Sequence, residues 1–180
     1  LSITTEAYPY GAGCTGIGAE FLAPEALSYQ GLEPGDIRYL PTGERVSSVA
    51  RLNELRSTDP GGIAVIDFLR ESDPDDLGFL MRAFLTADTA VASDAMPLVP
   101  PPGLAAHEIT WPIPPGVLTH PRTSGTFCRI LRWYVRELQL IDLAEAVRRC
   151  TLVPAEILRD VAPGMKRKGR IQVGADADLV

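Results

Sequence analysis

One short stretch of the chain places a carboxylate directly after a buried apolar run. Residues 89–92 (Thr-Ala-Val-Ala) have the composition of a short buried strand, and Ser93 and Asp94 follow them. In parallel α/β folds the functional groups gather at the carboxyl ends of strands, where a carboxylate can transfer protons. Aspartate also satisfies backbone donors wherever a strand ends, so a turn-capping role for Asp94 is the alternative.

Tyr8 and Arg122 are two further candidates for ligand contacts. Tyr8 follows the β-prone residues 2–7, at what we expect to be another strand end, although Tyr8 and Tyr10 would equally suit core aromatics at a strand edge. Arg122 precedes a predicted helix, where its charge gains nothing from the helix dipole. This misfit favours a ligand role over that of a surface arginine.

The histidines and cysteines lack the spacing of a metal site. His107 and His120 both lie in or beside the loop after Asp94. The three cysteines are odd in number and widely separated, which indicates reduced thiols rather than a disulfide framework or a zinc knuckle. No histidine is near Cys14 in the sequence, so we interpret Cys14 as a small buried residue rather than a nucleophile.

The bulk composition is ordinary for a soluble globular protein. The 180 residues are 46% hydrophobic and 22% charged, and the net charge of −6 argues against a nucleic-acid surface. No stretch approaches the roughly 18 apolar residues of a membrane span. We therefore expect a cytoplasmic protein with no nucleic-acid or membrane partner. Both ends of the chain fall inside expected strands, which predicts a piece of a longer protein.

Hydrophobic periodicity predicts the elements that position these residues. Residues 61–94 have the pattern of a strand, a helix capped by Asp73 and Pro74, and a second strand, and this βαβ order predicts neighbouring parallel strands. The glycine-rich residues 11–18 match no phosphate-binding motif and are interpreted as a flexible active-site loop. The proline-rich loop over 97–121 has a length typical of functional or disordered segments. Further helices are expected over 45–56, with Val46, Val49, Leu52 and Leu55 on one face, and over 123–138. Another helix is expected over 143–150, because Asp142 and Glu145 make a capping-box-like start.

Several stretches resemble one enzyme family. "SDAMPLV", "HPRTSGTFCRILRWYVRE" and "GRIQVGADADLV", together with the leading "EAYPYGAGCTG", are similar to the C-terminal part of the N-acyl-D-amino-acid deacylases, or D-aminoacylases, of the metal-dependent amidohydrolase superfamily. The resemblance implies an α/β fold, namely the last strands and helices of a TIM-type (β/α)₈ barrel. Residues 1–165 would belong to that barrel, and residues 166–180 would begin a strand of a small β-sandwich.

The resemblance also implies an activity and roles for individual residues. The family cleaves the amide bond of N-acyl-D-amino acids with zinc, which brings the pKa of bound water to about 7. Asp94 matches the aspartate that moves the proton and would at most be a weak metal ligand. Tyr8, Cys14, Thr15 and Arg122 match positions that hold the substrate carboxylate, and His120 would orient the loop. The other family metal ligands are absent from this sequence.

Two other functions remain open from the residues alone. One is a cyclic amidase related to dihydroorotase or hydantoinase. The other is a metal-free binding or assembly domain, which the missing histidines favour. We also expect self-association of the isolated chain, because strand edges without a partner are prone to pair.

Overall fold

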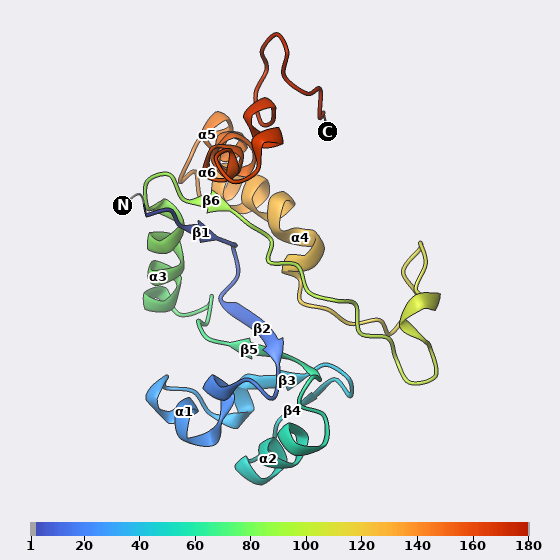
Figure 1. The fold of residues 1–180 in the computed structure, drawn as a ribbon. Coiled ribbons are helices and arrows are strands. Elements are labelled where there is room, and N and C mark those ends of the chain that lie inside the picture. Colours follow the sequence, from blue (N-terminus) through green and yellow to red (C-terminus); the bar gives the residue numbers. More distant parts are fainter. Residues whose placement is uncertain (1–2, 180) are drawn as a thin grey trace. The chain divides into compact units, whose positions relative to one another are not determined.

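The structure, a computed structural model, describes residues 3–179 of the chain and divides it into two compact units. Unit 1 consists of residues 1–9, 78–94 and 124–180, and unit 2 consists of residues 10–77 and 95–123. The chain therefore leaves unit 1 twice and returns to it twice. Together the units form a mixed α/β protein (Figure 1).

The described residues of unit 1 form one pair of parallel strands. Strand β1 (Glu6–Ala7) lies beside β6 (Ala90–Val91), with Glu6 opposite Ala90 (Figure 1). The Ala90 amide donates to the Thr5 carbonyl over 2.9 Å, and the Thr5 and Thr89 hydroxyls hydrogen-bond over 2.8 Å. The strand predicted before Asp94 is thus confirmed, with a parallel neighbour.

The predicted βαβ unit over residues 61–94 is nevertheless wrong in its pairing. Strand β5 (Ile63–Asp67) does not pair with β6 but lies in a separate four-stranded sheet, antiparallel to both of its neighbours. The helix between them, α3 (Pro74–Leu85), carries the chain from unit 2 to unit 1. Within β5 only Ala64 and Ile66 are fully buried, as in an antiparallel sheet with one covered face.

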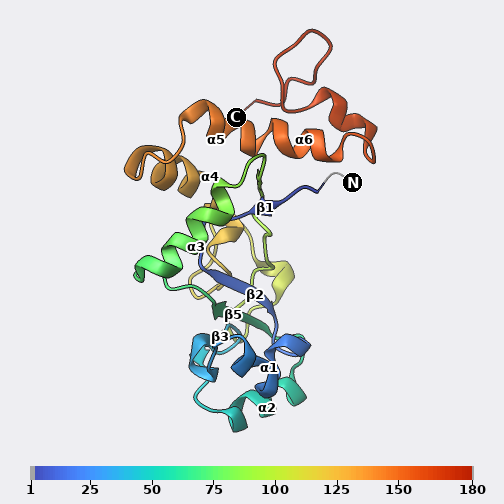
Figure 2. The same ribbon diagram turned by 90° about the vertical axis from the view of Figure 1, so that its left-hand side faces the viewer.

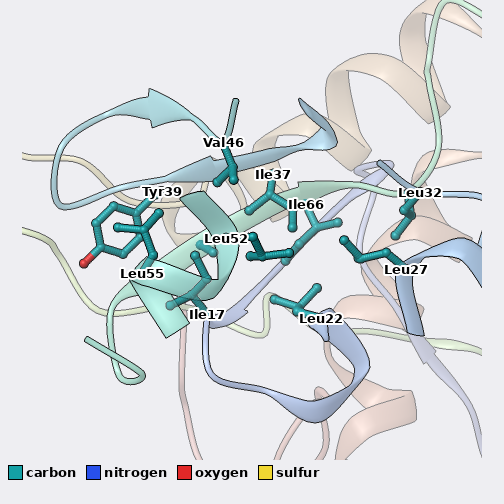
Figure 3. Packing of buried hydrophobic residues seen from close by; sticks show 11 residues of the cluster. Ile17, Leu22, Leu27, Leu32, Ile37, Tyr39, Val46, Leu52, Leu55 and Ile66 are labelled. Carbon is teal, nitrogen blue, oxygen red and sulfur yellow. The ribbon is translucent and has the colours of Figure 1, made fainter. Parts of the chain in front are cut away.

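Unit 2 is an antiparallel sheet covered by two helices on one face (Figures 1 and 2). Its core includes Ile37 and Ile66 from the sheet and Leu52 from a helix, all with 0% exposure (Figure 3). The sheet order is β2-β5-β3-β4. Besides β5, the part of this unit before residue 60 contains β2 (Ala12–Gly16), α1 (Pro24–Tyr29), β3 (Ile37–Tyr39), β4 (Glu44–Arg45) and α2 (Val49–Thr58), with short 3-10 turns at Glu20–Leu22 and Pro34–Asp36.

The interpretation of residues 11–18 as a flexible loop is wrong, because most of this stretch forms strand β2. Its glycines serve close packing rather than mobility. A Cβ on Gly13 would lie 2.6 Å from the Phe68 ring, and a Cβ on Gly18 would lie 2.7 Å from Pro60. Glycine is the residue that permits such close approach between neighbouring segments.

The predicted helices form, with shifts at their ends. Helix α3 begins as expected, with the Asp73 carboxylate accepting from the amides of Asp75 and Asp76. Helix α2 begins four residues later than the predicted start, where the Ser48 hydroxyl caps it. Val49, the first residue of α2, is 48% exposed although the apolar spacing predicted it on the same face as Leu52.

The predicted helix over 123–138 is confirmed but has two geometries. Helix α4 (Arg122–Arg129) continues as a π-helix over Ile130–Glu137. Tyr134 is fully buried there, and its ring meets the Phe84 ring of α3 edge-on at 4.4 Å. Helix α5 (Leu143–Cys150) follows, capped by Asp142 as predicted, and then α6 (Leu152–Leu158).

The C-terminal strand expected from Gly169 onward is not found among the described residues. After a 3-10 turn at Pro163–Arg167 the segment bends back on itself. The Asp176 amide donates to the Arg167 carbonyl over 2.9 Å, and the Lys168 ammonium lies 2.6 Å from Asp178. A strand requires the backbone of a neighbour, and these contacts within the segment replace it. The assignment of residues 1–165 to a barrel and 166–180 to a sandwich stays a prediction.

The proline-rich stretch 97–121 is a long loop, as predicted, and the structure shows that it is closed at its base. Val99 and Leu118 form an antiparallel bridge with N–O distances of 2.7 and 2.9 Å. The Thr123 hydroxyl accepts from the Met96 amide over 3.1 Å. Both limbs of the loop are therefore held together where it joins the rest of unit 2.

Candidate functional site

Tyr8 and Asp94 follow the same end of the parallel pair in unit 1. Strand β1 ends at Ala7 and β6 ends at Val91, and because the strands run parallel, both candidates come after carboxyl ends. Asp94 is exposed and has a backbone φ of +46°, a conformation in which aspartate is enriched among non-glycine residues. The placement predicted for both residues is confirmed.

His120 is fully buried in unit 2 and links two distant segments. Its Nδ1 accepts from the Arg122 amide over 3.0 Å, and its Nε2 lies 3.0 Å from the Ala12 carbonyl. A carbonyl only accepts, so Nε2 carries the proton, and Nδ1 is the acceptor of a neutral imidazole. The Tyr10 ring meets the imidazole edge-on at 5.6 Å. The tautomer of His120 is therefore set by its two partners.

Arg122 is not the surface arginine that was weighed as an alternative, since only 1% of it is exposed. It is the first residue of α4, and its guanidinium donates to the Cys14 carbonyl over 3.4 Å. Burying a guanidinium costs several kcal/mol unless polar groups surround it. Such a residue is held in one position rather than left to sample many.

Cys14 and Thr15 lie side by side on β2, opposite Val65 and Ala64 of β5. Both are half-buried. The contact between Cys14 and Arg122 is made by the backbone carbonyl of Cys14. Unit 2 therefore brings together three of the residues singled out by the sequence, namely Cys14, His120 and Arg122.

Sequence reasoning missed the polar residues that support this group. The Glu71 carboxylate accepts from the Gly11 amide over 3.2 Å, just before β2. The hydroxyls of Thr119 and Thr123 lie 3.0 Å apart and both reach Met96 at the start of the loop. Two threonines that bracket His120 and Arg122 at a spacing of four were the available signal.

The open pocket of about 570 Å³ in unit 2 is lined by Ala12, residues 69–72 and charged side chains. Arg45 lies 2.8 Å from Asp67, and Arg70 lies 3.4 Å from Asp36. These cations are neutralised by their own neighbours. With Glu71 the lining carries three acidic and two basic side chains, so the pocket offers no excess of positive charge to an anionic ligand.

The described residues do not fit a zinc site. Residues 3–179 contain no group of three or more histidine, cysteine, aspartate or glutamate side chains that could hold a metal. Both nitrogens of His120 are occupied by backbone partners, and His107 lies in a 3-10 turn of the loop (Ala106–Glu108). Asp94 as a weak ligand stays a prediction. Within the same residues, no helix is both long and apolar enough to cross a membrane.

The class of protein that this chain resembles is the group of enzymes that remove acyl groups from N-acyl-D-amino acids. Over 61 residues it is 44% identical to the N-acyl-D-glutamate deacylase of Alcaligenes xylosoxydans xylosoxydans, a match that covers 34% of this chain and 12% of that protein. Over 99 residues it is 32% identical to the N-acyl-D-aspartate deacylase of the same organism, covering 55% and 16%. No protein-family model matches the chain.

A solved structure extends the similarity to nearly the whole chain. The N-acyl-D-glutamate deacylase of Bordetella bronchiseptica, in complex with zinc and a phosphonate that mimics the tetrahedral intermediate, superimposes with a TM-score of 0.63 at 25% identity. The superposition covers 99% of this chain and 32% of that protein, so the chain spans about a third of its relative's length. The resemblance indicated by the sequence motifs is confirmed.

Proposed function

We propose that this chain is part of a hydrolase that cleaves the amide bond of N-acyl-D-amino acids to give a D-amino acid and a carboxylate. The observation that carries the proposal is the match to the solved deacylase over 99% of the chain. Two curated deacylases with acidic D-amino-acid substrates in their names match independently. An acidic D-amino acid is accordingly the first substrate class to test.

In this proposal the chain supplies the C-terminal part of a TIM-type barrel. The parallel pair of β1 and β6, with α3 leading into β6, supports that placement because barrels are built from parallel strands joined through helices. Unit 2 is then an insertion between the two strands, extended by the loop that follows β6. Residues 166–180 would continue toward the β-sandwich.

Asp94 is proposed to carry the proton transfer. Its carboxylate takes a proton from the attacking water and gives it to the nitrogen of the leaving amine, so that the carboxylate is regenerated. Its exposed position after the end of β6 supports this role, since functional groups of barrels gather at the carboxyl ends of strands.

Tyr8, Cys14, Thr15 and Arg122 are proposed to bind the substrate carboxylate. A planar guanidinium suits a bidentate grip on a carboxylate, and the interaction is stronger away from water. Because Arg122 is buried, a carboxylate reaches it only when the groups that cover it move aside. The competing role for Arg122 is to anchor the loop to β2.

Zinc belongs to the proposed complete enzyme, as it does to the solved relative. The described residues of this chain do not form its site. No step of the proposal is derived from the metal.

The test is substrate selectivity of the complete enzyme that contains this chain. We expect turnover of N-acetyl-D-glutamate or N-acetyl-D-aspartate, no turnover of the L enantiomers, and none of hydantoin. Cleavage of hydantoin or dihydroorotate without cleavage of any N-acyl-D-amino acid would overturn the proposal in favour of a cyclic amidase.

The role of Arg122 is tested separately by Arg122→Lys, which keeps the positive charge but loses the planar, bidentate donor geometry of the guanidinium. We expect KM for the N-acyl-D-amino acid to rise about tenfold or more, the value of a charge-assisted hydrogen bond. KM should not rise in this way for the same substrate when its α-carboxylate is replaced by a neutral amide. Equal losses for acid and amide would assign Arg122 to loop anchoring.

A further inference from the structure

We infer that His120 is a positioning residue that sets Arg122 against the open edge of β2 through both nitrogens of its imidazole. The inference rests on the proposed function, in which Arg122 grips the substrate carboxylate. It assigns to His120 the task of placing that guanidinium, without contact to the substrate.

The first step is the edge of the sheet. Strand β2 is an outer strand that pairs only with β5 in the order β2-β5-β3-β4. On the paired side, the Gly11 carbonyl accepts from the Leu69 amide over 2.9 Å. Carbonyls alternate between the two edges of a strand, so those of Ala12 and Cys14 point to the edge away from β5. These two acceptors are successive on that edge.

Side chains at the start of α4 and just before it hydrogen-bond to the carbonyls of Ala12 and Cys14. Ala12 receives the imidazole of His120, and Cys14 receives the guanidinium of Arg122. Two side chains spaced two residues apart thus contact two carbonyls spaced two residues apart. They take the place of a fifth strand and satisfy an edge that would otherwise need water or a partner.

His120 and Arg122 are also joined directly by a hydrogen bond. The first amides of a helix have no partner inside it, and Arg122 is the first residue of α4. His120 Nδ1 accepts from this amide, and its carbonyl accepts from the Thr123 amide over 3.0 Å. One imidazole therefore joins the start of α4 to a carbonyl 108 residues away.

The chemistry of imidazole explains why histidine stands here. A neutral imidazole accepts at one nitrogen and donates at the other, as the two partners of His120 require. An asparagine amide reaches only about as far as Nδ1, whereas a glutamine amide reaches about as far as Nε2. The two bonds can therefore be removed one at a time.

The experiment compares His120→Asn, His120→Gln and His120→Ala in the complete enzyme, with the acid and amide substrates used for Arg122. Asparagine keeps an acceptor for the Arg122 amide but loses the hydrogen bond to the Ala12 carbonyl. Glutamine keeps a donor for the Ala12 carbonyl but loses the hydrogen bond from the Arg122 amide. We expect each to raise KM for the acid by about threefold, and alanine by about tenfold, the range of one and two ordinary hydrogen bonds. The amide KM and kcat should stay within about twofold of wild type.

The matched control is His107→Ala, an exposed histidine of the same loop, which should change neither KM. If the alanine variant does not fold, the asparagine and glutamine variants decide. The role of His120 would be overturned if its variants raised KM equally for the acid and the amide substrate. It would also be overturned if they raised neither KM while Arg122→Lys raised KM for the acid alone. Loss of discrimination in Arg122→Lys itself would instead overturn the proposed function of the arginine, and the inference with it.

Discussion

The two units differ in how fully each covers its own apolar residues. Unit 2 buries a connected cluster between its sheet and its helices, drawn mostly from the continuous segment 10–77 (Figure 3). Unit 1 assembles a smaller cluster around Phe84, Ile130 and Tyr134 from separated segments. Highly exposed apolar side chains are also more numerous in unit 1, which leaves Val161 81% and Ile171 100% exposed, although Trp111 of unit 2 is 87% exposed as well.

The two units therefore differ in how far their own residues can stabilise them. Two paired residues per strand, as in β1 and β6, do not make an independently stable sheet. A four-stranded sheet with a covered face can be stable by itself. The proposal that the chain is part of a larger deacylase accounts for the exposed apolar side chains of unit 1, which would pack against the remainder.

The largest effect is expected at Asp94 in unit 1. In the complete enzyme, Asp94→Asn keeps the size and the left-handed backbone but cannot accept a proton, so kcat should fall by roughly 10²–10⁴-fold. Steady-state kinetics and thermal unfolding are measured together. The control is Asp88→Asn, since Asp88 has a φ of +55° in the same unit, and it should keep kcat within about threefold. Full turnover combined with lower stability would restore the turn-capping role.

The next effect concerns the core of unit 2. Leu52→Ala removes a fully buried side chain and should lower the free energy of unfolding by about 2–5 kcal/mol, because a cavity remains. Val49→Ala, on the same helix but 48% exposed, should change it by no more than about 0.5 kcal/mol. Hydrogen exchange should localise the loss to residues 10–77. Equal loss of protection throughout both units would contradict their separate behaviour.

A smaller effect is expected from the ion pairs of Glu145 in unit 1. Hydrogen bonds from Arg148 and, more weakly, Arg149 lower the pKa of Glu145 to about 2, against the attenuating effect of partial burial. A depressed folded-state pKa contributes stability above the ordinary value near 4.5, and that contribution is lost as the pH falls toward 2.

Glu145→Gln should therefore cost about 1 kcal/mol at pH 7 and progressively less below pH 4.5, as denaturant unfolding at several pH values would show. The exposed Glu156 provides the control, and Glu156→Gln should show a smaller cost at pH 7. A cost for Glu145→Gln that does not depend on pH would mean that packing, not charge, is responsible.

The smallest effect in the isolated chain is expected at Ile171. Because this side chain is fully exposed, Ile171→Thr should change the free energy of unfolding by no more than about 0.5 kcal/mol in the 180-residue chain. In the complete enzyme the same change should cost about 1 kcal/mol or more if the residue is packed there. Equal small effects in both proteins would mean that Ile171 is not packed in the complete enzyme, contrary to the explanation proposed for the exposed surface of unit 1.

Local signals predicted the elements well. Asp73 and Asp142 cap the helices they were expected to cap, because capping depends on residues within one turn. The apolar spacing over 123–138 predicted a helix, although not its change to π geometry. The motif at residues 120–122 predicted a loop-orienting histidine, and in the structure His120 hydrogen-bonds to both the Arg122 amide and the Ala12 carbonyl.

The pairings were decided by tertiary structure. The apolar run of β5 suits a parallel or an antiparallel strand equally, and only the arrival of β2 and β3 beside it selects the antiparallel sheet. Glycines in residues 11–18 suit a loop as well as a strand, until Phe68 is packed against Gly13. The contacts of Ala12 and Cys14 join residues 108 positions apart. Helix starts and periodicity are encoded within a few neighbouring residues, whereas such contacts exist only after the chain has folded.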